Sequence, residues 1–253
     1  MTIIERLRAA GCVFAEDEAA LLRETARDAA DLERMVRSRV EGLPLEHVLG
    51  WVEFAGRRYG IGPGVFVPRP RTEFLVRETA LIAKPGGVVL DLCCGSGAVG
   101  AALAEAIAAT ELYASDNDPV AVACARGNVE NVYEGNLYDA LPRSLMGRVD
   151  LLVVIAPYVP TDAIALLPRE ARTFEPLGTL DGGPDGLDVL RRVLEPARHW
   201  LAAGAILVTE VSARQLPALV VLVAAAGLEP SVIRDDDLDA TIVVGQHMIG
   251  RYV

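Results

Sequence analysis

Helical and extended patterns occupy different parts of this chain. Over residues 2–39, apolar positions recur at helical spacing among Ala, Leu, Arg and Glu, which predicts helices with a break at Gly11. Over residues 42–70, short apolar runs alternate with glycines, which predicts a β-hairpin. From residue 84 onward, apolar runs alternate with helix-forming segments, the pattern of a mostly parallel sheet with helices on both faces.

The boundaries of these elements follow from the same pattern. Thr72 is expected to cap a helix over 73–83. The last two strands, separated by acidic residues, are expected to form an antiparallel hairpin at a sheet edge. Strands are predicted near 88–92, 111–115, 131–133, 149–155, 205–211, 230–234 and 241–244, and helices near 99–109, 119–128, 186–201 and 213–226.

A glycine turn follows the strand that contains Asp91. Gly95 and Gly97 let a backbone approach a ligand closely, and a helix begins directly after them. An acid at this point suits a cationic ligand, such as the amino group of a methionine moiety, better than a pyrophosphate. Asp116 ends the next strand, at the separation of about 20 residues that suits a ribose hydroxyl. Together the two acids favour S-adenosylmethionine (SAM), and the alternative is an ordinary βα turn.

Later loops carry further candidates. Asn136 and Leu137 follow the third strand, where they could contact an adenine or form an ordinary turn. Pro157 and Tyr158 follow the fourth strand and should lie beside the methyl donor, because ligands sit outside the carboxyl ends of parallel strands. The long loop 172–186 is either a pocket wall or a set of solvated turns.

Composition narrows the class of protein. The 253 residues carry a net charge of −11, which argues against broad contact with a phosphate backbone. Four cysteines and three histidines show no metal-ligand spacing, so no metal site is expected. No apolar stretch is long enough to span a bilayer and no signal peptide is evident, so a cytoplasmic protein is expected.

In this order the motifs resemble those of the HemK-type peptide-chain-release-factor glutamine methyltransferases over nearly the whole chain. The matching segments are 42–50, 63–73, 91–97, 157–160, 175–176 and 181–187. The resemblance implies an N-terminal helical domain over 1–41, a β-hairpin linker over 42–72 and a methyltransferase domain over 73–253. That last domain would be an α/β, Rossmann-like, class I SAM-dependent fold with a seven-stranded, mostly parallel sheet.

The resemblance also implies roles for individual residues. SAM would be the cofactor, and the acceptor would be a release factor. No direct nucleic-acid partner is expected from the net charge, and no membrane partner from the length of the apolar stretches. The implied positions are Asp91, Cys93, Gly95, Gly97, Asp116, Asn117, Asn136 and Leu137 for the cofactor, Ile155, Ala156, Pro157 and Tyr158 for the acceptor loop, and Phe66, Arg69, Glu175 and Pro176 for the substrate.

Three positions depart from the family pattern. Ile155 stands where the family has the Asn whose side chain holds the glutamine amide, Cys93 replaces a glycine of the cofactor turn, and Arg71 replaces a Glu. Three hypotheses therefore stay open. Backbone carbonyls at Ile155 and Ala156 could still hold a glutamine amide. Ile155 and Tyr158 could instead form an apolar slot for a small, less polar or heteroaromatic acceptor. The chain could also bind SAM without catalysis.

Overall fold

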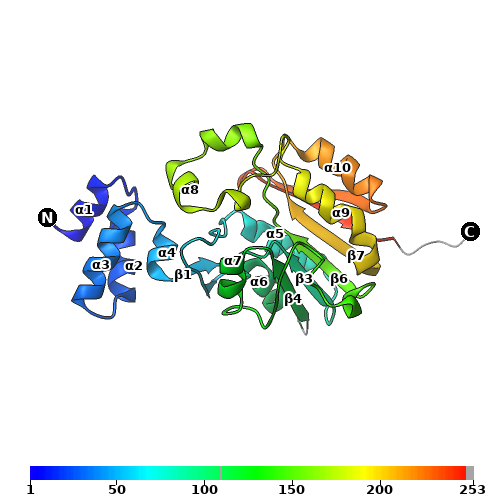
Figure 1. Cartoon of the computed structure of the whole chain (residues 1–253), viewed down its shortest axis with the longest axis horizontal. Helices are drawn as coiled ribbons and strands as arrows, with labels where there is room; N and C mark the ends of the chain where they lie inside the picture. The colour runs from blue at the N-terminus through cyan, green and yellow to red at the C-terminus, as the bar shows by residue number, and fades with distance from the viewer. Residues whose placement is uncertain (109, 249–253) are drawn as a thin grey trace, which may run out of the picture.

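The protein is built on a seven-stranded sheet. A computed structural model describes residues 1–108 and 110–248 (Figure 1). The strand order is β5-β4-β3-β6-β7-β9-β8, and β9 runs antiparallel to both β7 and β8 while the others are parallel. The strands are β3 (Val88–Leu92), β4 (Glu111–Asp116), β5 (Asn131–Glu134), β6 (Val149–Val154), β7 (Leu201–Glu210), β8 (Glu229–Asp235) and β9 (Ala240–Gln246).

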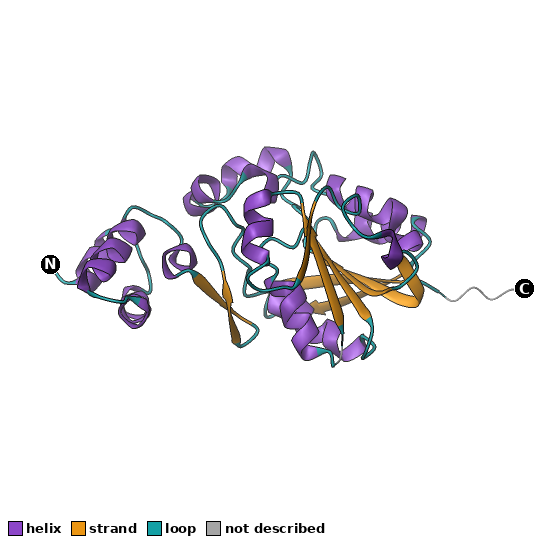
Figure 2. Ribbon diagram, turned by 60° about the horizontal axis from the view of Figure 1, so that its bottom comes forward, coloured by secondary structure: helices purple, strands orange, loops and turns teal. Residues whose placement is uncertain are grey.

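Helices cover both faces of the sheet (Figure 2). They are α5 (Thr72–Ile82), α6 (Ala98–Ala106), α7 (Pro119–Ala125), α9 (Asp188–Trp200) and α10 (Leu216–Ala225), while α8 (Arg169–Phe174) lies away from the sheet, in the segment between β6 and α9 (Figure 1). Successive side chains of a strand point to opposite faces. Leu151 and Val153 of β6 therefore pack with α5, α6 and α7, whereas Leu152 and Val154 pack with α9 and α10. Because both faces are buried at the centre of the sheet, β3 and β6 are nearly continuous apolar runs.

The N-terminal helices form a separate small core at one end of the elongated molecule (Figure 1). They are α1 (Ile3–Ala9), α2 (Ala15–Thr25), α3 (Ala29–Val40) and α4 (Leu45–Leu49). The hairpin of β1 (Trp51–Phe54) and β2 (Arg57–Gly60) follows them. Its Val52, Phe54 and Tyr59 pack into the same core as α5 and α6, so the hairpin is anchored on the sheet. The division of the chain into three domains stays a prediction.

The fold class and every predicted strand are confirmed, with shifts of at most four residues at the strand ends. The predicted C-terminal hairpin is present, with β8 at the sheet edge. The N-terminal helical region breaks a second time, since Asp28 caps α3 by accepting from the Asp31 N–H at 2.8 Å. The prediction for 99–109 ends on residue 109, which lies outside the described residues. Helix α4, helix α8 and three short 3₁₀ turns were not predicted.

The prediction that Thr72 caps α5 is wrong. Arg71 occupies the cap position, and Thr72 is the first residue of the helix. The Thr72 hydroxyl instead donates to Glu210 Oε2 at 2.7 Å, at the end of β7. A capping hydroxyl would accept from a backbone N–H of the first turn. Here the hydroxyl instead donates to a buried carboxylate, and hydrogen bonds to charged groups are the stronger ones.

Within the described residues, no helix has the length and apolarity needed to cross a bilayer. In the same part of the chain, no three His, Cys, Asp or Glu side chains cluster closely enough to hold a metal ion.

Candidate functional site

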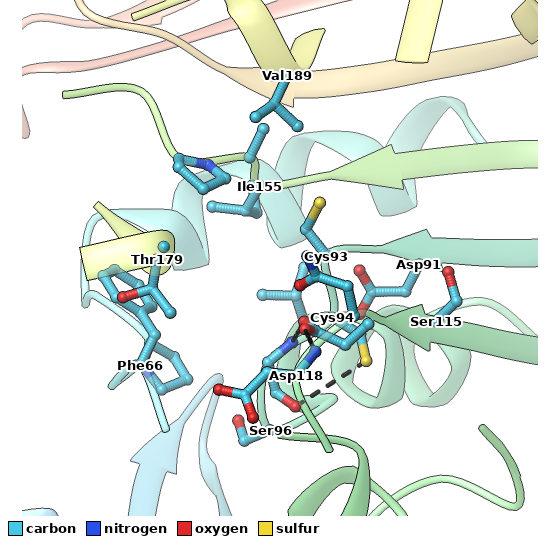
Figure 3. A pocket seen from close by; sticks show the side chains of 18 of the residues that line it. Phe66, Asp91, Cys93, Cys94, Ser96, Ser115, Asp118, Ile155, Thr179 and Val189 are labelled. Carbon is cyan, nitrogen blue, oxygen red and sulfur yellow. Dashed lines mark hydrogen bonds between the residues drawn. The ribbon is translucent and has the colours of Figure 1, made fainter. Parts of the chain in front are cut away.

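A cavity opens at the carboxyl ends of β3, β4, β5 and β6, where loops from four parallel strands meet (Figure 3). Phe66 and Thr179 lie on one side of it and face Cys93 and Cys94 on the other. Of the sequence-predicted site residues, all but Gly97 and Glu175 line this cavity. The cavity is also lined by residues that the sequence analysis did not assign to the site: Pro68, Thr72, Cys94, Ser96, Ala98, Val99, Ser115, Asp118, Gly178, Thr179, Val189 and Arg192.

Asp91 lies at the floor of the cavity and is 1% exposed. Its Oδ2 accepts from the Gly100 N–H at 2.9 Å, and a Cβ at Gly100 would stand 2.8 Å from the same oxygen. The missing side chain therefore lets α6 pack directly on β3. The pKa of Asp91 is raised to about 7, mainly because burial penalises its charged form; the Gly100 N–H acts to lower this pKa, and the nearby Asp116 charge acts to raise it. A cationic ligand would stabilise this carboxylate, which has no cation beside it within the described residues.

Asp116 ties the glycine turn to the end of β4. Its Oδ2 accepts from the Gly95 N–H at 2.9 Å, and its Oδ1 accepts from the Asp118 N–H at 3.0 Å. Burial raises the pKa of Asp116 above its usual range, against the lowering effect of these backbone donors. Each oxygen keeps a further lone pair for a ligand.

Cys93 adopts a left-handed backbone conformation, with φ of +57°. This region disfavours residues that carry a Cβ, so the glycine that the resemblance implies at this position would relieve backbone strain. Cys93 packs on the core beside Tyr138, and burial raises the pKa of both the Cys93 and Cys94 thiols. Both cysteines therefore stay neutral thiols that occupy space in the cavity.

The third strand end contributes an amide and an apolar side chain. Asn136 Oδ1 accepts from Arg192 Nη2 at 2.7 Å. Leu137 has φ of +53°, and its carbonyl accepts from the Ser115 hydroxyl at 3.0 Å. Arg192 reaches this edge from α9, and its role depends on a contact 56 residues away in sequence that no local motif signals.

The acceptor loop of Ile155, Ala156, Pro157 and Tyr158 leaves the end of β6 beside this cavity. Its far end is held twice, because Gln215 Nε2 donates to the Tyr158 carbonyl at 2.8 Å and Arg71 Nη2 donates to the Tyr158 hydroxyl. Neither the Ile155 nor the Ala156 carbonyl accepts a hydrogen bond in the described part of the chain. Two residues that line the cavity therefore carry backbone acceptors without a partner among the described residues.

The predicted substrate residues divide between two hollows. Phe66, Arg69 and Pro176 line the cavity, whereas Glu175 lines only the adjoining outer groove. Arg69 Nη2 contacts both carboxylate oxygens of Glu175 at 2.7 Å, and the Arg69 guanidinium lies 4.5 Å from the centre of the Phe66 ring. Burial raises the pKa of Glu175, and Arg69 lowers it. Glu175 thus holds Arg69 against the cavity wall.

The loop 172–186 forms a pocket wall in one part and a solvated turn in another. Pro176, Gly178 and Thr179 form one wall of the cavity. Asp185 instead forms a surface ion pair with Arg191, with about half of its side chain exposed.

Residues 64–157 match the family model described as Methyltransferase small domain. The chain is 35% identical to the release factor glutamine methyltransferase of Geobacter sulfurreducens over 187 residues, which cover 72% of this chain and 65% of that protein. It is also 35% identical to that of Gloeobacter violaceus over 199 residues, which cover 74% of this chain and 68% of that protein. The chain thus spans about two thirds of the length of these relatives.

A crystal structure of a methyltransferase from Pyrococcus furiosus superposes with a TM-score of 0.59 at 18% identity, and the match covers 77% of this chain and 90% of that one. This likeness establishes the fold. The sequence relationship establishes more: the chain belongs to the release factor glutamine methyltransferase family.

Proposed function

We propose that this protein transfers a methyl group from SAM to the side-chain amide nitrogen of a glutamine in a peptide chain release factor. Membership of the family supports the reaction class. The observation that carries the proposal is that the acidic residues Asp91 and Asp116 and the acceptor loop line a single cavity.

The residues present fit SAM. The cofactor carries a cationic amino group and a sulfonium, and the cavity floor offers the buried Asp91 carboxyl, which lacks a cation in the described part of the chain. Ser96 also lines the cavity, and its hydroxyl is buried and has no hydrogen-bond partner among the described residues. A buried polar group without a partner is costly, so a bound ligand would satisfy it. We assign Asp91 and Gly95 to the methionine part, Asp116 and Asn117 to the ribose, and Asn136 and Leu137 to the adenine.

SAM, when bound, supplies an electrophilic methyl group. The chain's own contribution is to orient the acceptor nitrogen and exclude water, which lowers the barrier without a strong base. Ile155 has no polar side-chain atom to hold an amide, so the free carbonyls of Ile155 and Ala156 would accept from its N–H groups. Phe66 and Pro176 would then close the cavity around the acceptor.

The cofactor assignment is tested by calorimetric titration with SAM. Asp91→Ala should abolish binding, because it removes the buried carboxylate that compensates the ligand charge. Asp236→Ala is the matched control, since Asp236 is an exposed acid in the β8–β9 turn. Equal affinity of Asp91→Ala and the unmodified chain would contradict the assignment.

The acceptor assignment is tested with methyl-labelled SAM and a purified release factor. Label on the release factor supports the proposal. If SAM binds but no label transfers, the Ile155→Asn variant separates two explanations: activity regained shows that the amide contact had been lost, and continued inactivity shows that release factors are not the acceptors.

A further inference from the structure

Arg71 joins three elements that meet beside the acceptor loop. It stands at the N-terminus of α5, and its Nε donates to Glu210 Oε1 at 2.7 Å. Its Nη2 donates to the Tyr158 hydroxyl, and its guanidinium carbon lies 5.7 Å from the centre of the Tyr158 ring. The Thr72 hydroxyl donates to the other carboxylate oxygen of Glu210. One guanidinium therefore connects α5, the end of β7 and the loop after β6.

This contact is supported by burial and charge. The Glu210 side chain is 6% exposed, so its carboxylate requires a cation or several donors, and Arg71 and Thr72 provide both. Loss of the cation would leave a buried carboxylate facing the Tyr158 ring and would remove the side-chain donor that the described residues offer to the Tyr158 hydroxyl. The ring would then lose the contact that sets its position.

Tyr158 is restrained from two directions. Gln215 holds its carbonyl at 2.8 Å, and Arg71 holds its hydroxyl. The residue lines both the cofactor cavity and the outer groove, so its ring forms part of the wall between them. Because Tyr158 is three residues from Ile155, a fixed ring also limits the movement of the carbonyls at the end of β6.

We propose that Arg71 is a positioning residue that, through Tyr158, holds the backbone of the acceptor loop where its carbonyls can orient the acceptor amide. The proposal rests on the proposed function. Arg71 and Ile155 would then be linked departures from the family pattern. Because the Ile155 side chain cannot hold the amide, the backbone carbonyls must do so, and Arg71 restrains the loop that carries them. An acid at position 71 could not form this contact, since it would face the Glu210 carboxylate.

The matched variants are Arg71→Met and Arg77→Met. Arg77 lies on the same helix, stacks on Phe74 with 5.1 Å to the ring centre and pairs with Glu78 at 3.0 Å, but it does not line the cavity. Arg71→Met should lower kcat for methyl transfer by about tenfold to a hundredfold, the range that misplacement of reacting groups produces. Its affinity for SAM should stay within about twofold of the unmodified value. Arg77→Met should change neither quantity, and Arg71→Lys should recover part of kcat.

A double substitution tests the link to Ile155. In the Ile155→Asn background a side chain again holds the amide, so Arg71→Met should cost several-fold less in kcat than it does alone. An equal loss in both backgrounds would show that Arg71 acts independently of the amide contact and would overturn the link.

Hydrogen exchange supplies a readout that does not depend on activity. The Val159 N–H donates to the Leu180 carbonyl at 3.0 Å, and the Thr161 N–H donates to the Gly183 carbonyl at 3.0 Å. Arg71→Met should speed exchange in the peptide that carries these amides, and Arg77→Met should not. Unchanged exchange with Arg71→Met would overturn the proposal whether or not a release factor is methylated. Absence of transfer by the unmodified chain, with the expected exchange result, would refute only the proposed function.

Discussion

Gly186 offers the sharpest test of how the acceptor loop is held. Its φ is +76°, and a Cβ there would overlap both the Tyr158 carbonyl oxygen and the Gln215 amide nitrogen. Gly186→Ala therefore imposes a strained backbone and also pushes apart the hydrogen bond that fixes Tyr158. Gly147 is the matched control, because its φ is +71° and a Cβ there would meet nothing within 4 Å.

The two costs can be separated in magnitude. A left-handed residue with a Cβ costs about 1–2 kcal/mol, and the lower entropy of the unfolded Ala chain returns about 0.4–1 kcal/mol. Gly147→Ala should therefore cost about 1 kcal/mol. Overpacking adds about 1–3 kcal/mol, and a weakened hydrogen bond adds about 1 kcal/mol. Gly186→Ala should therefore cost about 3–5 kcal/mol.

Urea unfolding measures both variants. Trp200 reports on the main core, since its ring stacks on Tyr138 with 5.2 Å between ring centres. Gly186→Ala should lower the free energy of unfolding by at least about 2 kcal/mol more than Gly147→Ala, and should slow methyl transfer in the fraction that remains folded. Equal destabilisation by the two variants would show that the loop has room for a Cβ and would refute the packing described here.

Three further predictions concern the cavity and its walls. The pKa of Asp91 is raised to about 7, mainly by burial, so between about pH 4 and pH 7 the folded chain holds a proton that the unfolded chain has lost. The free energy of unfolding should therefore fall as pH rises through this window, and it should fall less in Asp91→Asn. Identical pH profiles of the two proteins would contradict the raised pKa of Asp91. Cys93→Gly removes a strained Cβ but also removes the packing of the thiol, so its stability, measured by thermal unfolding, should lie within about 1 kcal/mol of that of the unmodified chain. A loss of about 3 kcal/mol would show that thiol packing outweighs the backbone strain. Glu175→Gln removes the charge that holds Arg69, so the KM for the acceptor should rise about tenfold while the affinity for SAM, measured by calorimetry, stays unchanged. A loss of SAM affinity would instead show that the Arg69–Glu175 ion pair contacts the cofactor.

Regular elements could be predicted wherever the apolar pattern had one clear period. The strand Val88–Leu92 was predicted at its observed limits because both faces of the sheet are buried and its apolar run ends at a glycine turn. Helix α8 was not predicted, since it lies between prolines and has no apolar stripe. The start of β7 was placed four residues late, because Gly204 within the strand resembles a strand boundary.

The cavity could be predicted in outline, because the ends of parallel strands meet at one sheet edge and the motifs lie at those ends. Contacts between distant segments could not. Thr72 was expected to cap α5, and only the folded chain brings Glu210 within reach of its hydroxyl. The position of Arg71 at Tyr158 and that of Arg192 at Asn136 likewise depend on contacts 87 and 56 residues apart in sequence.

The most direct test of the account is peptide mapping of a release factor by mass spectrometry after incubation with this protein and SAM. The account predicts one added methyl group on the side-chain nitrogen of a glutamine, formed by the unmodified chain and absent with Asp91→Ala. A release factor that stays unmethylated in the presence of SAM-bound protein, or that gains its methyl group on another residue type, would contradict it.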